Sequence, residues 1–410
     1  MATRSITAQQ MQGQQIQQNI RPQDFSWPFW PIVPLYPYGK RRTIRQEVIK
    51  DKLWTFDQIQ GILYVIVPIR MSVVKLIGGG LLIYAPVAPT PECIQLVREL
   101  EEQHGEVKYI ILPTVSGIEH KVFVGPFARY FKKAQVYVAP SQWSFPLNLP
   151  LSWLGFPGNR THILPFDSRQ TPFADQFDYA ILNTIELGLG RFQEVAFFDK
   201  YSQTLLVTDS VVSVPKNPPA IVQLYPYSLL FHAKEDAFDV VVDNEANRRK
   251  GWQKICLFAL YIRPSTLESL GLLETLANAF KAPDRSKQAY FGLFPFRWQY
   301  NWQQSFDALQ TDNPLLVAPI LQTLIFNRAP QDTFNWVEKV ASWDFKRIVS
   351  CHLDSPIEAN FSQFRQAFNF LTQNPSLTPQ NQSLPQTDFQ FLRAVDRNLS
   401  KFRIVPPPQS

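Results

Sequence analysis

A glutamate and a histidine stand together at the end of one strongly apolar segment of the sequence. Val107 to Leu112 is a run of mostly β-branched and apolar residues, Pro113 interrupts it, and a short loop then ends in Glu119 and His120. This pattern predicts a buried strand that delivers both side chains to the mouth of a sheet. Carboxylate and imidazole groups are ligands of divalent transition metals, so metal binding is the chemistry that this pair indicates.

Two further polar residues follow strand-like segments elsewhere in the chain. Asp209 stands in the segment TLLVTD, the second strand of a hairpin predicted between Glu194 and Val212. His352 ends the short segment RIVSC, which follows an amphipathic helix that begins near Thr333. Both residues are therefore expected at strand ends, as Glu119 and His120 are.

Each of these residues also has a purely structural interpretation. Ser116 and Glu119 have the spacing of a capping box, in which Glu119 would only stabilise the start of a helix. Asp209 could cap the turn after its strand, and His352 could be a partly buried histidine with satisfied hydrogen bonds. The residues alone leave metal binding and these structural roles open.

A second candidate site combines three cations with an indole. Arg248, Arg249, Lys250 and Trp252 could bind an anion or a lipid headgroup, or could be a helix start whose tryptophan packs on the core. His232 is followed by acidic residues at irregular spacing, which favours a solvated loop over a metal site.

The composition excludes several classes of protein. The chain has 410 residues, 3 cysteines and a formal net charge of +6. Cys93, Cys256 and Cys351 show no C-x-x-C spacing, which argues against a zinc knuckle or a disulfide framework and suits a reducing compartment. Basic residues concentrate between Lys40 and Lys52, a stretch too small to indicate nucleic acid. We identify neither a signal peptide nor a membrane-spanning apolar run, so we expect a cytoplasmic protein.

Residues 1–46 predict an N-terminal arm. Its first part is Gln-rich and expected to be disordered, and prolines alternate with large aromatic residues from Phe25 to Arg42. These prolines forbid a helix and favour an extended segment. The arm could lie across a groove of its own domain. Alternatively, it could dock on a protein partner or a membrane surface, because Trp and Tyr beside basic residues suit a headgroup boundary.

Strands and helices alternate along the remainder of the chain. Residues 47–214 predict the first part of an α/β domain and residues 331–372 its continuation. Residues 215–330, where the pattern changes to mixed helices, predict an insertion or lid. Residues 373–410 form a Pro/Gln-rich tail with one short helical piece.

The order of these elements and the motif TVSGIEH resemble the metallo-β-lactamase superfamily, and within it a divergent branch of unknown function known from cyanobacteria and plastids. The family motif is H-x-H-x-D-H. In this sequence Val115 and Gly117 occupy the two positions where histidines would bind a first metal. Glu119 stands for the aspartate, and His120 stands for the final histidine.

The resemblance implies an αββα sandwich of two mixed sheets, with its metal site at the sheet edge and a large, mostly helical insertion. Asp209 then takes the place of the bridging aspartate, and His352 that of the last histidine. The segment IELGLGRFQ, where a further histidine is expected, contains none. The first-metal ligands are therefore missing, whereas Glu119, His120, Asp209 and His352 remain and could hold one Zn, Fe or Mn ion.

Two functions follow from the resemblance. The first is a non-hydrolytic binding or assembly protein that has lost the first metal site and contacts a protein partner or a membrane surface through its arm. The second is a divergent mononuclear metallohydrolase that acts on an ester, a thioester or a phosphate. Hydrolysis of the two-metal kind is not expected, because the water-activating half is missing. The implied location is cytoplasmic, peripheral to an internal membrane, or the plastid stroma in a eukaryote.

Overall fold

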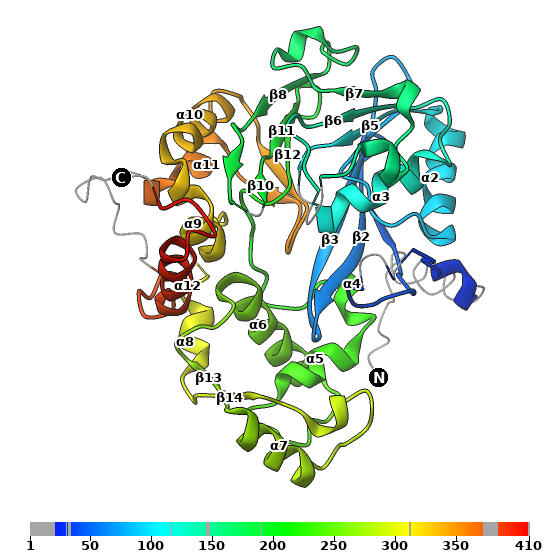
Figure 1. Cartoon of the computed structure of the whole chain (residues 1–410). Coiled ribbons are helices and arrows are strands. Elements are labelled where there is room, and N and C mark those ends of the chain that lie inside the picture. The colour runs from blue at the N-terminus through cyan, green and yellow to red at the C-terminus, as the bar shows by residue number, and fades with distance from the viewer. Residues whose placement is uncertain are drawn as a thin grey trace, which may run out of the picture.

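Two mixed β-sheets stacked face to face form the centre of the molecule (Figure 1). The computed structural model describes residues 21–29, 31, 34–115, 117–144, 148–188, 190–310, 313–371 and 384–408. Helices cover the outer face of each sheet, so the layers follow the order helix, sheet, sheet, helix. The predicted αββα class is therefore confirmed.

The first sheet has seven strands in the order β1 to β7, antiparallel from β1 to β4 and parallel from β4 to β7. Its strands are β1 (Ile44–Ile49), β2 (Leu53–Ile62), β3 (Val65–Lys75), β4 (Leu81–Tyr84), β5 (Val107–Leu112), β6 (Gln135–Val138) and β7 (Thr161–Ile163). Alternate residues face opposite sides. Ile110 packs under helices α2 (Pro91–His104) and α3 (Val122–Ala128), while Ile111 faces the second sheet.

The second sheet has five strands in the order β16-β15-β12-β11-β8. They are β8 (Phe177–Ile181), β11 (Val195–Asp199), β12 (Thr204–Val207), β15 (Arg347–Ser350) and β16 (Ile357–Glu358). Phe198 packs under helices α10 (Pro330–Val340) and α11 (Phe361–Ala367), whereas Phe197 faces the first sheet. There, Tyr84 packs against Phe197 and its hydroxyl donates to the Val195 carbonyl oxygen at 3.0 Å. The sandwich core therefore includes a polar link between the sheets.

One parallel pairing decides where the candidate site residues emerge. β12 and β15 run parallel with Val207 opposite Ser350, while the other pairings in this sheet are antiparallel. Asp209 lies two residues after Val207, and His352 lies two residues after Ser350. Because parallel strands end at the same edge of a sheet, both residues leave the sheet side by side.

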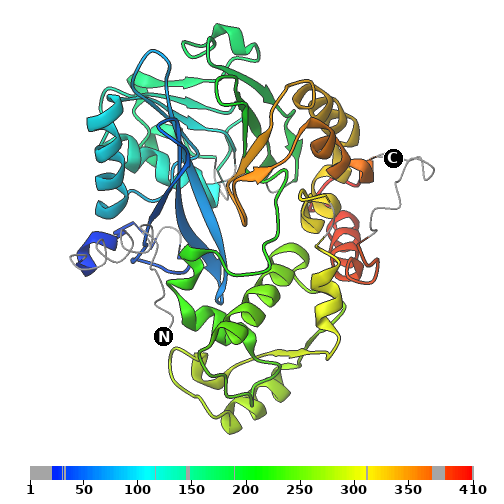
Figure 2. The same cartoon turned by 180° about the vertical axis from the view of Figure 1, so that it is seen from behind.

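The chain between β12 and β15 contains the insertion, which lies beyond one end of the sandwich (Figures 1 and 2). It is mostly helical, as predicted, and α6 is buried along most of its length. The helices are α4 (Ala220–Gln223), α5 (Pro226–Ala233), α6 (Glu245–Tyr261), α7 (Leu272–Lys281), α8 (Trp302–Asp307) and α9 (Pro319–Leu324), with the hairpin β13 (Leu267–Ser269) and β14 (Phe296–Trp298). A further two-stranded hairpin, β9 (Ile185–Glu186) and β10 (Arg191–Phe192), precedes β11.

The described part of the N-terminal arm lies across its own domain. Trp27 is buried and packs edge-on against Phe123 of α3, with ring centroids 5.4 Å apart. Tyr36 forms a backbone bridge with Gly61 of β2. Contact of the arm with a partner or a membrane stays a prediction. In the part of the chain that the structure describes, no helix is long and apolar enough to span a bilayer.

Gly117–Lys121 form a π-helical turn that runs directly into helix α3. The structure differs from the sequence-based expectation at one local point. His232 does not lie in a solvated loop: it is fully buried in α5, where its Nε2 lies 3.0 Å from the Leu63 carbonyl oxygen. The carbonyl can only accept, so Nε2 carries the proton and donates.

Burial lowers the pKa of His232 to about 4, with the Leu63 carbonyl opposing the shift and Lys254 adding to it. The unfolded chain binds this proton below about pH 6.5, whereas the folded chain resists it. The free energy of unfolding should therefore fall as the pH is lowered from about 6.5 to 4, by up to roughly 3 kcal/mol from this group. Urea titrations at several pH values should show a smaller loss in His232→Gln, which keeps a donor. His162→Gln, at an exposed residue of β7, should lose as much stability at low pH as the natural chain does. An equal pH dependence of the free energy of unfolding in all three proteins would contradict the assignment of this loss to His232.

Candidate metal site

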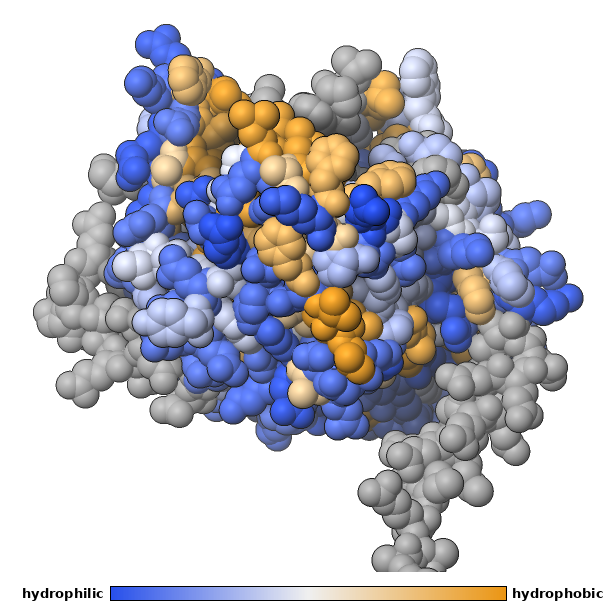
Figure 3. All heavy atoms as spheres, turned by 90° about the horizontal axis from the view of Figure 1, so that it is seen from below, coloured by the Kyte–Doolittle hydropathy of each residue, from blue (hydrophilic) through white to orange (hydrophobic). Residues whose placement is uncertain are grey.

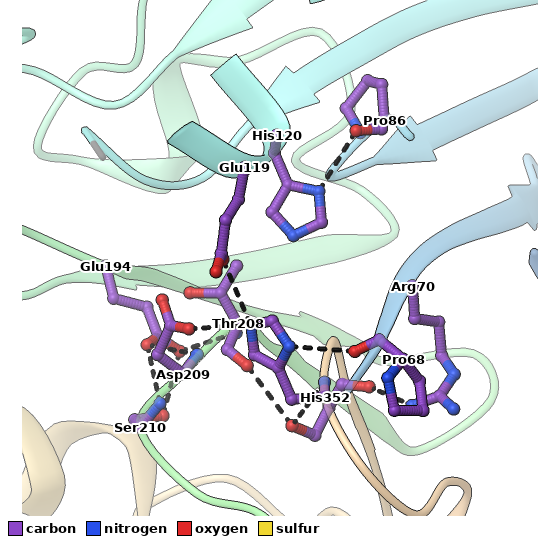
Figure 4. A network of polar contacts seen from close by, with 11 residues as sticks. Pro68, Arg70, Pro86, Glu119, His120, Glu194, Thr208, Asp209, Ser210 and His352 are labelled. Atoms are coloured by element: carbon purple, nitrogen blue, oxygen red, sulfur yellow. Dashed lines mark hydrogen bonds and ion pairs between the residues drawn. The ribbon is translucent and has the colours of Figure 1, made fainter. Parts of the chain in front are cut away.

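Glu119, Asp209 and His352 meet in one cluster (Figure 4), each offering a ligand atom within 4.8 Å of the others. The Nε2 atom of His352 lies 3.2 Å from Oε2 of Glu119 and 3.0 Å from Oδ1 of Asp209. Glu119 comes from the turn after β5, and the other two come from the ends of β12 and β15. Three side chains distant in sequence thus converge on one point.

The other ring nitrogen fixes the tautomer of His352. Its Nδ1 lies 3.0 Å from the Pro68 carbonyl oxygen, which can only accept, so Nδ1 carries the proton and donates. The lone pair on Nε2 then points at two carboxylate oxygens, which would repel it. A proton or a metal cation at Nε2 removes this repulsion, and a ligating histidine usually donates its other N–H in this way.

His120 has the same arrangement. It is fully buried, and its Nδ1 lies 3.1 Å from the Pro86 carbonyl oxygen, to which it must donate. Its Nε2 has no hydrogen-bond partner within the described chain. Figure 4 shows this edge of the ring turned toward Glu119 and His352. His120 lies outside the group whose ligand atoms are within 4.8 Å of one another. An orphaned buried nitrogen on this side of the cluster is still a candidate ligand atom, because a buried polar atom without a partner is costly.

The two histidines differ in charge in the metal-free protein. Burial on its own would lower the pKa of His352, but Glu119 and Asp209 outweigh it and hold that pKa well above the usual value. Burial would likewise raise the pKa of Glu119, but His352 lowers it to about 2. Burial lowers the pKa of His120, against the opposing charge of Glu119. His352 is therefore the protonated ring and His120 the neutral one.

Glu194 holds the loop that carries Asp209. Its buried carboxylate accepts hydrogen bonds from the backbone N–H groups of Thr208, Asp209 and Ser210 at 2.9, 3.0 and 2.9 Å, and from the Ser210 hydroxyl at 2.9 Å. Burial raises the pKa of Glu194, the charge of Asp209 adds to this, and the hydrogen bonds oppose it. Sequence analysis missed this residue. An acidic residue directly before the apolar strand β11 was its only signal.

Arg70 holds the loop that carries His352. This buried side chain of β3 donates to the carbonyl oxygens of Ser350 and Leu353 at 2.7 and 3.1 Å, and pairs in bidentate fashion with Asp57. Pro68, which receives the His352 N–H, lies on the same strand. Sequence analysis missed this support as well, although an arginine inside an apolar strand was a usable signal.

The positions expected for a first metal offer no ligand in the described chain. Val115 is buried in the core between the sheets, and Gly117 has no side chain. Ser116 lies outside the described residues, so the capping box is not tested. The carboxylate of Glu119, in turn, contacts His352.

The four residues of the second candidate site all have partners within the chain. Arg248 pairs with Asp243 at 2.6 Å, Arg249 donates to Asn217 at 2.7 Å, and Lys250 pairs with Glu235 at 2.7 Å. Trp252 is buried, and its Nε1 donates to the Pro215 carbonyl oxygen at 2.8 Å. These residues lie on α6, outside the Glu119 cluster.

Glu194→Gln should destabilise the fold through the Asp209 loop. An amide offers one acceptor oxygen in place of two, and its NH₂ group would face backbone N–H groups in a buried position. We expect the free energy of unfolding to fall by about 2–3 kcal/mol in urea titrations. Glu186→Gln is the matched control, since Glu186 is half-exposed in a surface ion pair with Arg191 and should cost under about 1 kcal/mol. Equal losses would contradict the role of Glu194.

Solved structures similar to the chain include a metallo-β-lactamase from Pontibacter korlensis (12% identity, TM-score 0.33, covering 43% of this chain and 76% of that one). They also include the Flv1 flavodiiron core from Synechocystis (8% identity, TM-score 0.40, covering 81% of this chain and 61% of that one). A third is a variant of the flavo di-iron protein from Thermotoga maritima (8% identity, TM-score 0.39, covering 81% of this chain and 62% of that one). No curated protein matches the sequence. The family model described as "Domain of unknown function (DUF4336)" matches residues 50–370, and the chain belongs to that family.

Proposed function

We propose that this protein holds one divalent transition-metal ion, Zn, Fe or Mn, through Glu119, Asp209 and His352, with His120 as a fourth ligand. One observation carries the proposal: Nε2 of His352 lies between two carboxylate oxygens while the Pro68 carbonyl holds the proton on Nδ1. The orphaned, buried Nε2 of His120 supports it independently.

The donor set suits this class of metal. Two imidazoles and two carboxylates are a common first shell for zinc, iron or manganese. Both histidines donate Nδ1–H to a proline carbonyl, the outer contact that orients ligating rings. A bound ion would supply a Lewis acid that attracts an anionic ligand or lowers the pKa of a bound water.

We further propose that the site holds one ion and serves binding rather than two-metal hydrolysis. Val115 is a core residue and Gly117 has no side chain, so neither supplies a ligand where the resemblance expects a first metal. Among the described residues, Glu119, Asp209 and His352 form the only cluster with metal-ligand spacing. A second ion that could stabilise the opposite side of a reacting group would have no such ligands.

A mononuclear hydrolase is the second candidate. The side chains of Glu119 and Asp209 are 26% and 22% exposed, so water can reach them. Catalytic metal sites keep a position open to solvent or substrate, whereas structural zinc sites are closed. This partial exposure favours a reactive site, with an ester, a thioester or a phosphate as the substrate.

Metal content tests the proposal. The untagged full chain, purified without chelator and measured by plasma mass spectrometry, should carry close to one ion per chain. His352→Ala, and His120→Ala combined with His352→Ala, should lose it, because each removes ligand nitrogen. His162→Ala is the matched control, because this exposed histidine lies outside the Glu119 cluster, with its Nε2 2.9 Å from Gln135, and should leave the metal in place. A content of two ions per chain would contradict the assignment of a single metal ion. A content of no ion would contradict metal binding altogether.

Turnover distinguishes the two candidates. The metal-loaded chain and His352→Ala should hydrolyse p-nitrophenyl acetate, an acyl thioester and bis-p-nitrophenyl phosphate at the same background rates, because a binding protein does not stabilise the transition state. Initial rates measured by absorbance check this. A rate at least tenfold higher in the natural chain than in His352→Ala would instead establish the mononuclear hydrolase.

A further inference from the structure

An apolar pocket of about 370 Å³ lies between the tip of the β2–β3 hairpin and the insertion. Its lining includes the buried side chains of Phe258 and Leu267, together with Val65, Phe296 and Phe391. Small-molecule sites are concave, mostly apolar and roughly 300–1,000 Å³ in volume. The pocket therefore has the size and the lining of a ligand site, and it is separate from the Glu119 cluster.

Apolar residues also surround the mouth of the pocket. Ile62 is 63% exposed, Leu63 is 53% exposed and Ile262 is 40% exposed. Seen from the insertion end, hydrophobic side chains gather in patches on a mainly hydrophilic surface (Figure 3). Contiguous exposed apolar surface indicates a binding site, whereas scattered single residues do not.

The backbone at the mouth is strained. Ile262 has φ +62° and ψ −54°, a left-handed conformation that a β-branched residue rarely adopts. The N–H of Arg263 donates to the Tyr261 carbonyl oxygen at 2.6 Å, which closes a γ-turn at the end of α6. Strain of this kind persists only where the surrounding structure holds it, and it concentrates at functional sites. Here it places Ile262 and Arg263 at the mouth.

Arg263 is the only charged side chain among the described lining residues. Its guanidinium lies over the ring of Phe391, 4.8 Å from the centroid, and no carboxylate pairs with it in the described chain. Arg297 and Arg328, by contrast, are paired with acidic residues. An exposed guanidinium without a counter-ion at the edge of an apolar pocket is complementary to an anionic headgroup.

We infer that this pocket binds the alkyl chain of an anionic amphiphile, with Arg263 pairing with its headgroup. The alkyl chain would cover the apolar side chains of the pocket, and each buried methylene contributes roughly 0.8 kcal/mol to the free energy of binding. An extended peptide fits less well, because Ser269 is the only other polar side chain in the lining and the peptide N–H and C=O groups would lack partners. The ligand can come from solution, as a fatty acid, or from a bilayer, as an anionic lipid.

Displacement of fluorescent cis-parinaric acid from the full chain tests the inference. Laurate should displace the probe about tenfold more strongly than dodecanol, because the alcohol lacks the charge. Arg263→Gln should weaken laurate binding about tenfold and leave dodecanol unchanged. Arg397→Gln, an exposed arginine of α12 (Gln390–Lys401), is the matched control and should change neither.

A second pair of variants tests the apolar mouth. Ile62→Gln should weaken laurate and dodecanol alike, because it removes apolar contact without adding charge, whereas Trp153→Gln, at a residue 76% exposed elsewhere, should have no effect. Sedimentation with phosphatidylglycerol and phosphatidylcholine vesicles identifies the source of the ligand. Anionic-vesicle binding lost in Arg263→Gln indicates a bilayer lipid, and laurate binding without vesicle binding indicates a free acid. The inference would be overturned if the protein bound neither laurate nor anionic vesicles. It would also be overturned if Arg263→Gln and Arg397→Gln changed laurate binding equally.

Discussion

The parallel pairing of β12 with β15 is the constraint on which the candidate metal site depends. With Val207 opposite Ser350, Asp209 and His352 must leave the same edge of the sheet at neighbouring positions. An antiparallel pairing would send them to opposite ends. The direction of the two strands therefore brings Asp209 and His352 to neighbouring positions, and their side chains then contact each other.

That parallel pairing requires a long connection, and the insertion supplies it. Adjacent parallel strands cannot be joined by a tight turn, because the chain must return to the starting edge before the second strand begins. Here the return passes through a helical unit whose core around α6 also includes Ile59 of β2 and Ile66 of β3. The insertion is thus the crossover of the second sheet as well as the unit that forms the apolar pocket with the β2–β3 hairpin.

Two of the loops that form the site are each held by a buried charged side chain from outside the loop. β3 of the first sheet holds the His352 loop of the second sheet through Arg70 and the Pro68 carbonyl. Glu194 holds the Asp209 loop through four hydrogen bonds. Buried charges are costly unless they are paired or hydrogen-bonded. Arg70 pairs with Asp57, and Glu194 is compensated by its four hydrogen bonds. The rigid support lets two carboxylates remain close to one imidazole.

Most strands could be predicted from the sequence, because apolar runs such as Val107–Leu112 and the segment TLLVTD are bounded by turn residues. The αββα class was implied only by the resemblance that the order of these elements and the motif TVSGIEH carry. Glu119, Asp209 and His352 could be proposed because each follows such a run. Glu194 and Arg70 each gave a signal, as a charged residue beside or inside an apolar strand, but their roles could not be predicted. Their partners are mostly backbone groups of distant loops, and a backbone acceptor or donor leaves no pattern in the sequence. His232 was misjudged for a related reason: acidic neighbours suggested solvent, whereas α5 buries the imidazole against Leu63.

Strand β3 also links the two proposed sites. Val65, at its start, lines the apolar pocket, and Pro68, three residues further on, receives the His352 N–H. At about 3.3 Å per residue these positions are roughly 10 Å apart on one stiff strand. A substitution at Val65 would therefore disturb both sites and could not separate their roles. Arg263 and Ile62 lie at the mouth of the pocket, and Asp209 and His352 lie in loops that follow strands of the second sheet. Changes at these residues can therefore assign each function to its own site.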